Sequence, residues 1–135
     1  MIKLQKSTFF NEKDTKDKLC KFILQADILS MGDECKKFEA AFSKKQNRAF
    51  STFVNSGSSA NLILIQSLLS LGRIKKGDFV AVSALTWPTN IMPLIQLGLI
   101  PYLVDCEIET LNISSKSLLV ALEAEPKIKL LFLTN

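Results

Sequence analysis

The segment VNSGSSANLILIQSLL, residues 54–69, places a short polar turn directly before a long apolar run. The turn combines one glycine with several side chains that donate or accept hydrogen bonds. The apolar run is long enough for a helix, and Gly72 follows it in a position where glycine commonly ends helices. We therefore expect a nearly all-apolar helix, covered by a sheet and by other protein, that begins at a polar turn.

The sequence around this helix alternates between strand and helix patterns. Apolar runs typical of strands occur at residues 49–54, 79–83, 100–104 and 128–133. Helical patterns occur between them, at residues 60–71, 88–98 and 115–123. Connections of this length suit crossovers between parallel strands, so the predicted fold class is α/β, with a mainly parallel sheet flanked by helices.

Two further helices are predicted ahead of the first strand. Residues 12–29 carry apolar side chains three and four positions apart, which is typical of an amphipathic helix with a lysine-rich outer face. The same spacing continues up to Lys45, and Gly32 followed by Asp33 predicts a stop and then the N-cap of this second helix.

The composition argues against several classes of protein. A length of 135 residues with 47% apolar and 22% charged residues suits one globular core. The net charge of +4 comes from lysines interleaved with acidic residues, and Arg48 and Arg73 are the only arginines, so no nucleic-acid surface is expected. The sequence has no apolar signal-peptide core and no run of about 18 apolar residues, so we expect a cytoplasmic protein without a membrane span.

The chain contains no histidine, and its cysteines, at positions 20, 35 and 106, are far apart. Histidine is the commonest general base and a frequent metal ligand, so a Ser-His-Asp triad is excluded within this chain and no metal site is expected. The odd number of cysteines and the lack of Cys-x-x-Cys spacing favour reduced thiols.

The polar turn before the apolar helix is the first candidate site, because parallel α/β sheets bind ligands at the carboxyl ends of their strands. Its candidate residues are Ser56, Gly57, Ser58 and Ser59. Unpaired N–H groups and the positive end of the helix dipole meet there, glycine permits close approach, and hydroxyls add donors, which predicts a phosphate site. The alternative is that Ser56 or Ser58 only caps the helix. The turn matches neither the Walker pattern nor the dinucleotide-binding glycine pattern.

Trp87, the only tryptophan, lies just after the strand predicted at residues 79–83. Its indole is suited to stack on a planar heterocycle whose phosphate occupies the serine turn. The alternative is a hydrophobic anchor beneath the loop. Thr89 and Asn90 are candidates for contacts with the same ligand, or they cap the next helix.

Several stretches of this sequence resemble the DegT/DnrJ/StrS sugar aminotransferases. They are GDECKKFEAAF, VNSGSSANLILIQSLL, KKGDFVAVSALTWPTNIMPLIQLGLIPYLVDCEIETLNIS and KLLFLTN. The resemblance implies the aspartate-aminotransferase fold, fold type I, and the cofactor pyridoxal 5′-phosphate (PLP). It implies that residues 32–135 form an incomplete, amino-terminal part of the PLP-binding large domain, and that residues 1–31 are a helical segment before it. WPTN and DCEIETLNIS look most similar to the branch acting on nucleotide-linked keto-deoxyhexoses for lipopolysaccharide or O-antigen sugars.

The resemblance also implies roles for individual residues. The family's phosphate motif falls on Ser56, Gly57, Ser58 and Ser59, and its ring-stacking residue falls on Trp87, with Thr86 and Asn90 beside it as substrate contacts. The family's catalytic lysine, the histidine that replaces it in related dehydratases, and the acid that pairs with the pyridine nitrogen have no counterpart here, so no catalytic residue is assigned. Lys75 and Lys76 cannot substitute, because they precede a strand at the opposite end of the sheet.

The function implied by the resemblance is that of a PLP-dependent nucleotide-sugar aminotransferase, which moves nitrogen from a donor such as glutamate to a keto-deoxy sugar. The alternative within the family is a nucleotide-sugar 3-dehydratase that uses the same cofactor. Family members are longer and homodimeric, so we expect this chain to be an inactive fragment that exposes apolar edges, above all at residues 128–133. The residues alone also leave open a non-catalytic α/β module that binds a phosphate ligand.

Overall fold

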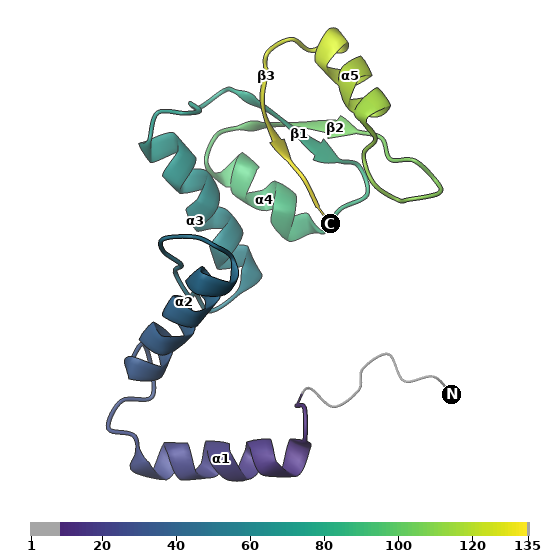
Figure 1. The fold of residues 1–135 in the computed structure, drawn as a ribbon. Helices are drawn as coiled ribbons and strands as arrows, with labels where there is room; N and C mark the ends of the chain where they lie inside the picture. Colours follow the sequence, from purple (N-terminus) through teal and green to yellow (C-terminus); the bar gives the residue numbers. More distant parts are fainter. Residues whose placement is uncertain (1–8, 135) are drawn as a thin grey trace. The chain divides into compact units, whose positions relative to one another are not determined.

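The computed structural model describes residues 9–134 (Figure 1). In this part of the chain the elements are α1 (Glu12–Gln25), α2 (Asp33–Lys45), α3 (Gly57–Ser70), β1 (Phe79–Ser83), α4 (Pro88–Gln96), β2 (Ile100–Val104), α5 (Ser115–Ala124) and β3 (Ile128–Phe132). Of the described residues, 9–53 belong to one compact unit and 54–134 belong to a second. The second unit contains the whole sheet.

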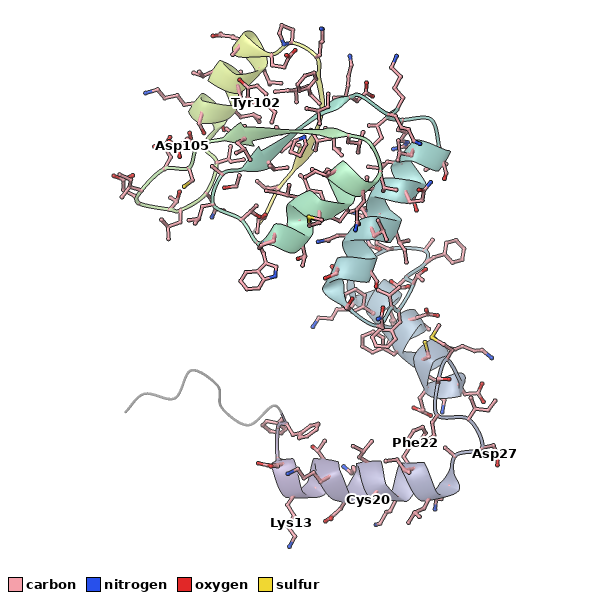
Figure 2. The ribbon with its side chains drawn as sticks, turned by 180° about the vertical axis from the view of Figure 1, so that it is seen from behind. Lys13, Cys20, Phe22, Asp27, Tyr102 and Asp105 are labelled. Carbon is pink, nitrogen blue, oxygen red and sulfur yellow. The ribbon has the colours of Figure 1, made fainter. Side chains whose placement is uncertain are left out.

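The first unit consists of the two predicted amphipathic helices. α1 begins at the predicted residue but ends at Gln25, because Ala26 already adopts an extended backbone. None of its residues is buried, and Phe22, on its apolar face, is 38% exposed (Figure 2). The N-cap of α2 is Gly32 and not the predicted Asp33, which lies in the first turn, where a negative charge favours the helix dipole.

The strand predicted at residues 49–54 is wrong, because the structure places no strand there. The segment runs against α2 instead. The Phe53 N–H donates to Glu39 Oε1 at 2.8 Å, the Ser43 hydroxyl donates to the Ser51 hydroxyl at 2.8 Å, and the Phe53 ring meets Phe38 edge-on. A strand requires the backbone of a neighbouring strand, and strand propensity does not supply that neighbour.

The second unit contains a parallel sheet in the order β2-β1-β3, which confirms the α/β fold class. β1 and β2 have the predicted bounds, and β3 ends at Phe132, one residue before the predicted end. β1 pairs with both neighbours, with Val80 opposite Pro101 and Val82 opposite Phe132. The carboxyl ends of β1 and β3 therefore lie side by side.

Pro101 lies on the outer edge of β2. The N–H of the preceding residue, Ile100, donates to the Asp78 carbonyl at 3.0 Å and so points toward β1. Backbone N–H groups alternate in direction along a strand, so the Pro101 nitrogen faces away from β1. A proline nitrogen carries no hydrogen, and the edge of the sheet is where strands tolerate it.

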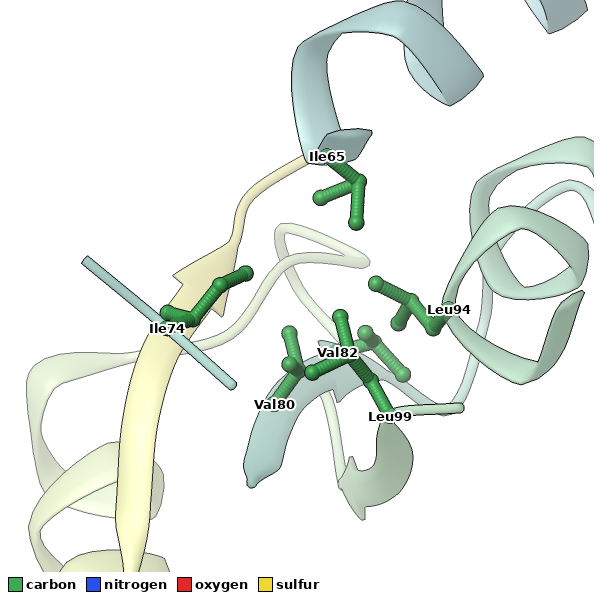
Figure 3. Close-up of a cluster of buried hydrophobic side chains, with 6 residues drawn as sticks. All are labelled: Ile65, Ile74, Val80, Val82, Leu94 and Leu99. Atoms are coloured by element: carbon green, nitrogen blue, oxygen red, sulfur yellow. The ribbon is translucent and has the colours of Figure 1, made fainter. Parts of the chain in front are cut away.

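The side chains of β1 alternate between two cores, one on each face of the sheet. Val80 and Val82 enter a cluster with helices α3 and α4, whose buried members are Ile65, Ile74, Val80, Val82, Leu94 and Leu99 (Figure 3). Ala81 enters a second cluster with Val104 and with Ala121 of α5. A strand buried on both faces has the continuous apolar sequence that FVAVS shows.

The two helices after β1 begin as the sequence predicts. Pro88 occupies the first turn of α4, where its missing N–H costs nothing, and Pro93 lies buried inside the helix. α5 is capped by Ser114, whose hydroxyl accepts from the Ser117 N–H at 3.0 Å while Ser117 Oγ accepts from the Ser114 N–H at 3.0 Å. None of the helices in residues 9–134 has the length and apolar content to cross a membrane.

We expect Leu94→Ala to lower the free energy of unfolding of the second unit by about 2–5 kcal/mol, because Leu94 is fully buried and its loss leaves a cavity. Urea unfolding followed by circular dichroism measures this change. The matched control is Leu119→Ala, at a 60% exposed leucine of α5, with an expected change within about 0.5 kcal/mol. Equal changes for the two variants would contradict the assignment of the core.

Candidate functional site: the amino ends of α3 and α4

The predicted serine turn forms the amino end of α3. Ser56 is the N-cap, and its hydroxyl accepts from the Ser59 N–H at 3.2 Å. The Ser59 hydroxyl donates to Asn55 Oδ1 at 2.7 Å and lies 3.2 Å from the Ser56 hydroxyl. The capping alternative is thus realised for Ser56, while Ser58 is exposed and its hydroxyl has no partner within residues 9–134.

Capping by Ser56 leaves two donors of the first turn available. The N–H groups of Ser59 and Ala60 are bonded to Ser56, whereas those of Gly57 and Ser58 have no acceptor in the described part of the chain. Such unpaired N–H groups carry the positive end of the helix dipole. Together with the Ser58 hydroxyl, they form a group of exposed donors that we call the α3 turn, residues 55–59.

Trp87 is the N-cap of α4 and is 70% exposed. The Asn90 N–H donates to the Trp87 carbonyl at 2.9 Å, and Asn90 Nδ2 donates to Thr86 Oγ1 at 2.9 Å. The backbone on both sides of the tryptophan is therefore fixed while the indole stays accessible. This exposure argues against the alternative in which Trp87 is a hydrophobic anchor beneath the loop.

A side chain of α3 connects the two helix starts. Asn61 Nδ2 donates to the Thr89 carbonyl at 3.2 Å and to Asn90 Oδ1 at 2.8 Å. Asn61 lies one turn after Gly57 on the same face of α3. Because α3 and α4 also share one hydrophobic core, the α3 turn and the loop between β1 and α4, residues 84–87, which we call the Trp87 loop, belong to one region (Figure 1).

The end of β3 contributes to the same region. Thr134 Oγ1 lies 2.9 Å from Thr86 Oγ1 and accepts from Asn90 Nδ2 at 3.1 Å. The predicted candidates Thr86 and Asn90 therefore contact each other and Thr134, and Asn90 also contacts Asn61. All four residues are half-buried. The structure brings Thr86, Trp87 and Asn90 together at the amino end of α4 and joins them to α3 through Asn61.

Sequence reasoning missed Asn61 and Thr134. Asn61 carried a signal, since it is a polar residue within the otherwise apolar run ANLILI. A buried or half-buried side-chain amide in such a run needs hydrogen-bond partners, and the start of a neighbouring helix can supply them. Thr134 carried no comparable signal, because its role depends on β3 lying next to β1.

A cavity of about 350 Å³ lies elsewhere, between β2 and α5. Its lining includes the apolar Val120 and the charged Lys116, together with Tyr102 of β2 and Asp105 just after β2, both labelled in Figure 2. It lies on the α5 side of the sheet, opposite to the core shared with α3 and α4. It is therefore separate from the α3 turn and from Trp87.

The sequence model of the DegT/DnrJ/EryC1/StrS aminotransferase family matches residues 11–128. The chain belongs to this family. Its members include PLP-dependent sugar aminotransferases and dehydratases, which confirms the predicted resemblance. The motif stretches that carried the resemblance include the α3 turn and the Trp87 loop, so the two helix starts lie within the matched region.

Individual members of the family give the level of similarity. The chain is 38% identical over 107 residues to GDP-4-keto-6-deoxy-D-mannose 3-dehydratase of Escherichia coli O55:H7, which covers 78% of this chain and 28% of that protein. It therefore spans less than a third of the length of that relative.

Solved structures of family members confirm the fold. A GDP-4-keto-6-deoxymannose-3-dehydratase with a trapped PLP-glutamate geminal diamine is 37% identical, with a TM-score of 0.77, over 86% of this chain and 30% of that chain. An aminotransferase from Psychrobacter cryohalolentis, 23% identical, gives a TM-score of 0.77 over 94% of this chain and 31% of that chain, and supports the fold alone. The sheet and helices described here are thus part of the PLP-dependent aminotransferase fold.

We expect Ser56→Ala to lower the free energy of unfolding by about 1 kcal/mol, because it removes the cap of α3. Ser58→Ala is the matched control, since its hydroxyl makes no hydrogen bond in the described residues, and its expected change is within about 0.5 kcal/mol. Thermal or urea unfolding measures both. A larger loss for Ser58→Ala than for Ser56→Ala would contradict the assigned cap.

Proposed function

We propose that this chain forms the cofactor-binding part of a PLP-dependent enzyme that acts on a nucleotide-linked keto-deoxy sugar. The α3 turn binds the phosphate of PLP, and Trp87 lies against its pyridine ring. The observation that carries the proposal is the Asn61 bridge, which holds a group of exposed anion-binding donors and an exposed indole in one region.

The α3 turn fits a phosphate group. Its free donors are two backbone N–H groups and one hydroxyl at the start of a helix of 14 residues, an arrangement that favours anions. A Cβ added to Gly57 would meet no heavy atom within 4 Å, so the space beside these donors is open. The side chains of helical residues tilt toward the amino end, so any residue other than glycine would extend into this space.

The Trp87 loop fits a planar ring. The indole is 70% exposed, so stacking on a ring would bury apolar surface. Because Asn90 already holds the backbone of the loop, binding would not carry the entropic cost of ordering it. In the proposed complex, Thr86 and Asn90 hold this loop and lie beside the substrate. Bound PLP supplies an electron sink for bonds broken at the carbon next to the transferred nitrogen. The residues of this chain bind and orient it, and none of them is assigned a catalytic role.

Within the family, we propose the 3-dehydratase branch rather than the aminotransferase that the sequence first suggested. Two family members at 38% and 37% identity are 3-dehydratases of a GDP-linked keto-deoxymannose, whereas the aminotransferase from Psychrobacter cryohalolentis is 23% identical. A dehydratase of this kind also takes an amino donor, for which glutamate is the candidate because it is the adduct in one such relative. An aminotransferase for lipopolysaccharide or O-antigen sugars is the second candidate. A cytoplasmic location and a homodimeric assembly are part of the proposal by resemblance to the family.

The sequence that follows Asn135 in the gene decides between the two branches. We expect it to continue the family's sequence and to place a histidine at the position of the cofactor-linking lysine, as the dehydratase proposal requires. Reading the adjacent genomic sequence is the measurement. A lysine at that position would contradict the dehydratase assignment and favour the aminotransferase.

We expect the chain to bind pyridoxamine 5′-phosphate saturably, and Trp87→Ala to weaken this binding about tenfold through loss of stacking. The amine form is the probe, because it lacks the aldehyde with which PLP reacts at surface lysines. Gly57→Ala should weaken binding as well, while its free energy of unfolding changes by less than about 0.5 kcal/mol, since the added methyl group meets no protein atom. Equilibrium dialysis measures the binding.

The same experiment tests the non-catalytic phosphate-ligand module. Inorganic phosphate that binds as tightly as pyridoxamine 5′-phosphate, with no effect of Trp87→Ala on either, would favour that module. If the wild-type chain binds neither ligand, both proposals are contradicted. Gln66→Ala, on the exposed side of α3, is the control and should bind like wild type.

A further inference from the structure

We propose that Asn61 is a positioning residue that couples occupancy of the α3 turn to the placement of the Trp87 indole. The proposal rests on the function proposed above and adds a residue for which neither the family motif nor the sequence analysis gave a role. Asn61 does not touch the ligand in this account. It acts through the Asn90 side chain and the backbone of α4.

The hydrogen bonds of Asn61 fix the orientation of two amides. The Thr89 carbonyl can only accept, so the group that Asn61 presents to it at 3.2 Å must be the NH2. The same NH2 then faces Asn90 Oδ1 at 2.8 Å, which leaves the Asn90 NH2 to donate to Thr86 and Thr134. Reversing the Asn61 amide would place its oxygen against the Thr89 carbonyl and would turn the Asn90 oxygen toward the two threonines, whose hydroxyls would then have to donate to it.

The chain of contacts leads from the phosphate site to the indole. Gly57 and Asn61 are four residues apart on α3, so an anion bound at the Gly57 N–H and the Asn61 amide share one face of the helix. Asn61 holds Asn90, and Asn90 holds both the side chain of Thr86 and the carbonyl of Trp87. From Asn61 to the Trp87 carbonyl, each link is a direct hydrogen bond between neutral groups.

Thr134 anchors the far side of this chain of contacts. It follows β3, and its hydroxyl meets both Thr86 and Asn90. The Trp87 loop is therefore held between α3 on one side and the carboxyl end of β3 on the other. Without Asn61, the loop keeps its contact with β3 but loses its hydrogen-bonded connection to α3, so the indole no longer responds to events at the α3 turn.

Three variants separate the positioning role from charge and from folding. Asn61→Leu has the same shape as asparagine and removes the donor without adding charge. Asn61→Asp keeps an acceptor and places it against the Thr89 carbonyl and Asn90 Oδ1, which it repels. Gln66→Glu makes the same change from amide to carboxylate on α3, where the Ser70 hydroxyl that Gln66 contacts can donate to the new carboxylate.

The readout is acrylamide quenching of the Trp87 fluorescence, which is specific because the chain has one tryptophan. In wild type and Gln66→Glu, we expect saturating inorganic phosphate to change the quenching constant. In Asn61→Leu and Asn61→Asp, we expect this phosphate dependence to be lost, the ligand-free indole to be quenched more readily, and affinity for pyridoxamine 5′-phosphate to fall about tenfold. Circular dichroism at the same temperature confirms that each variant is folded.

The possible results distinguish this proposal from the proposed function. Asn61→Leu and Asn61→Asp that match wild type in ligand affinity, in phosphate dependence and in ligand-free quenching would overturn the role of Asn61 while leaving the cofactor site intact. If wild type binds no ligand, the proposed function fails, and the comparison of ligand-free quenching between wild type and Asn61→Leu still decides whether Asn61 positions the indole. Unchanged quenching in that comparison would overturn the positioning role as well.

Discussion

The burial of β1 on both faces is the constraint on which the second unit depends. Val80 and Val82 are fixed in the core with α3 and α4, and Ala81 is fixed in the core with α5. β2 and β3 hold its two edges. Because the strand is held on every side, its carboxyl end is fixed too, and the loop that leaves it reaches Trp87 from a rigid starting point. A rigid element gives a binding loop its precision.

The candidate site built on this strand uses neutral groups. Its donors are backbone N–H groups of Gly57 and Ser58 and side-chain amides and hydroxyls, and its connection from α3 to α4 is an amide pair. Lys75 and Lys76 precede β1 and so lie at the other end of the sheet. An anion at the α3 turn would thus be held by the helix dipole and by hydrogen bonds of fixed geometry, which select for shape more strongly than a mobile lysine does.

The sequence predicts features that depend on neighbouring residues better than features that depend on residues far away along the chain. β1 was predicted to the residue because its apolar run reports burial that the strand itself undergoes. β2 also has its predicted bounds, although Val104 is its one buried residue in the described part of the chain. Residues 49–54 show the same propensity, yet form no strand, because pairing depends on a neighbour that the local sequence does not describe. Trp87 was found by chemistry at a strand end and the α3 turn by chemistry at a helix start, although the strand expected before that turn does not form. Asn61 and Thr134, by contrast, take their roles from contacts 28 to 48 residues away in sequence.

Pro101 on β2 determines at which edge of the sheet a further strand can pair. Any chain that approached the outer edge of β2 would meet a nitrogen without hydrogen at Pro101, where a regular ladder needs a donor. β3 has no proline, and its outer backbone offers a full set of donors and acceptors. Further strands, from this or another chain, can therefore pair with the outer edge of β3. That edge lies beside Thr134 and the amino end of α4.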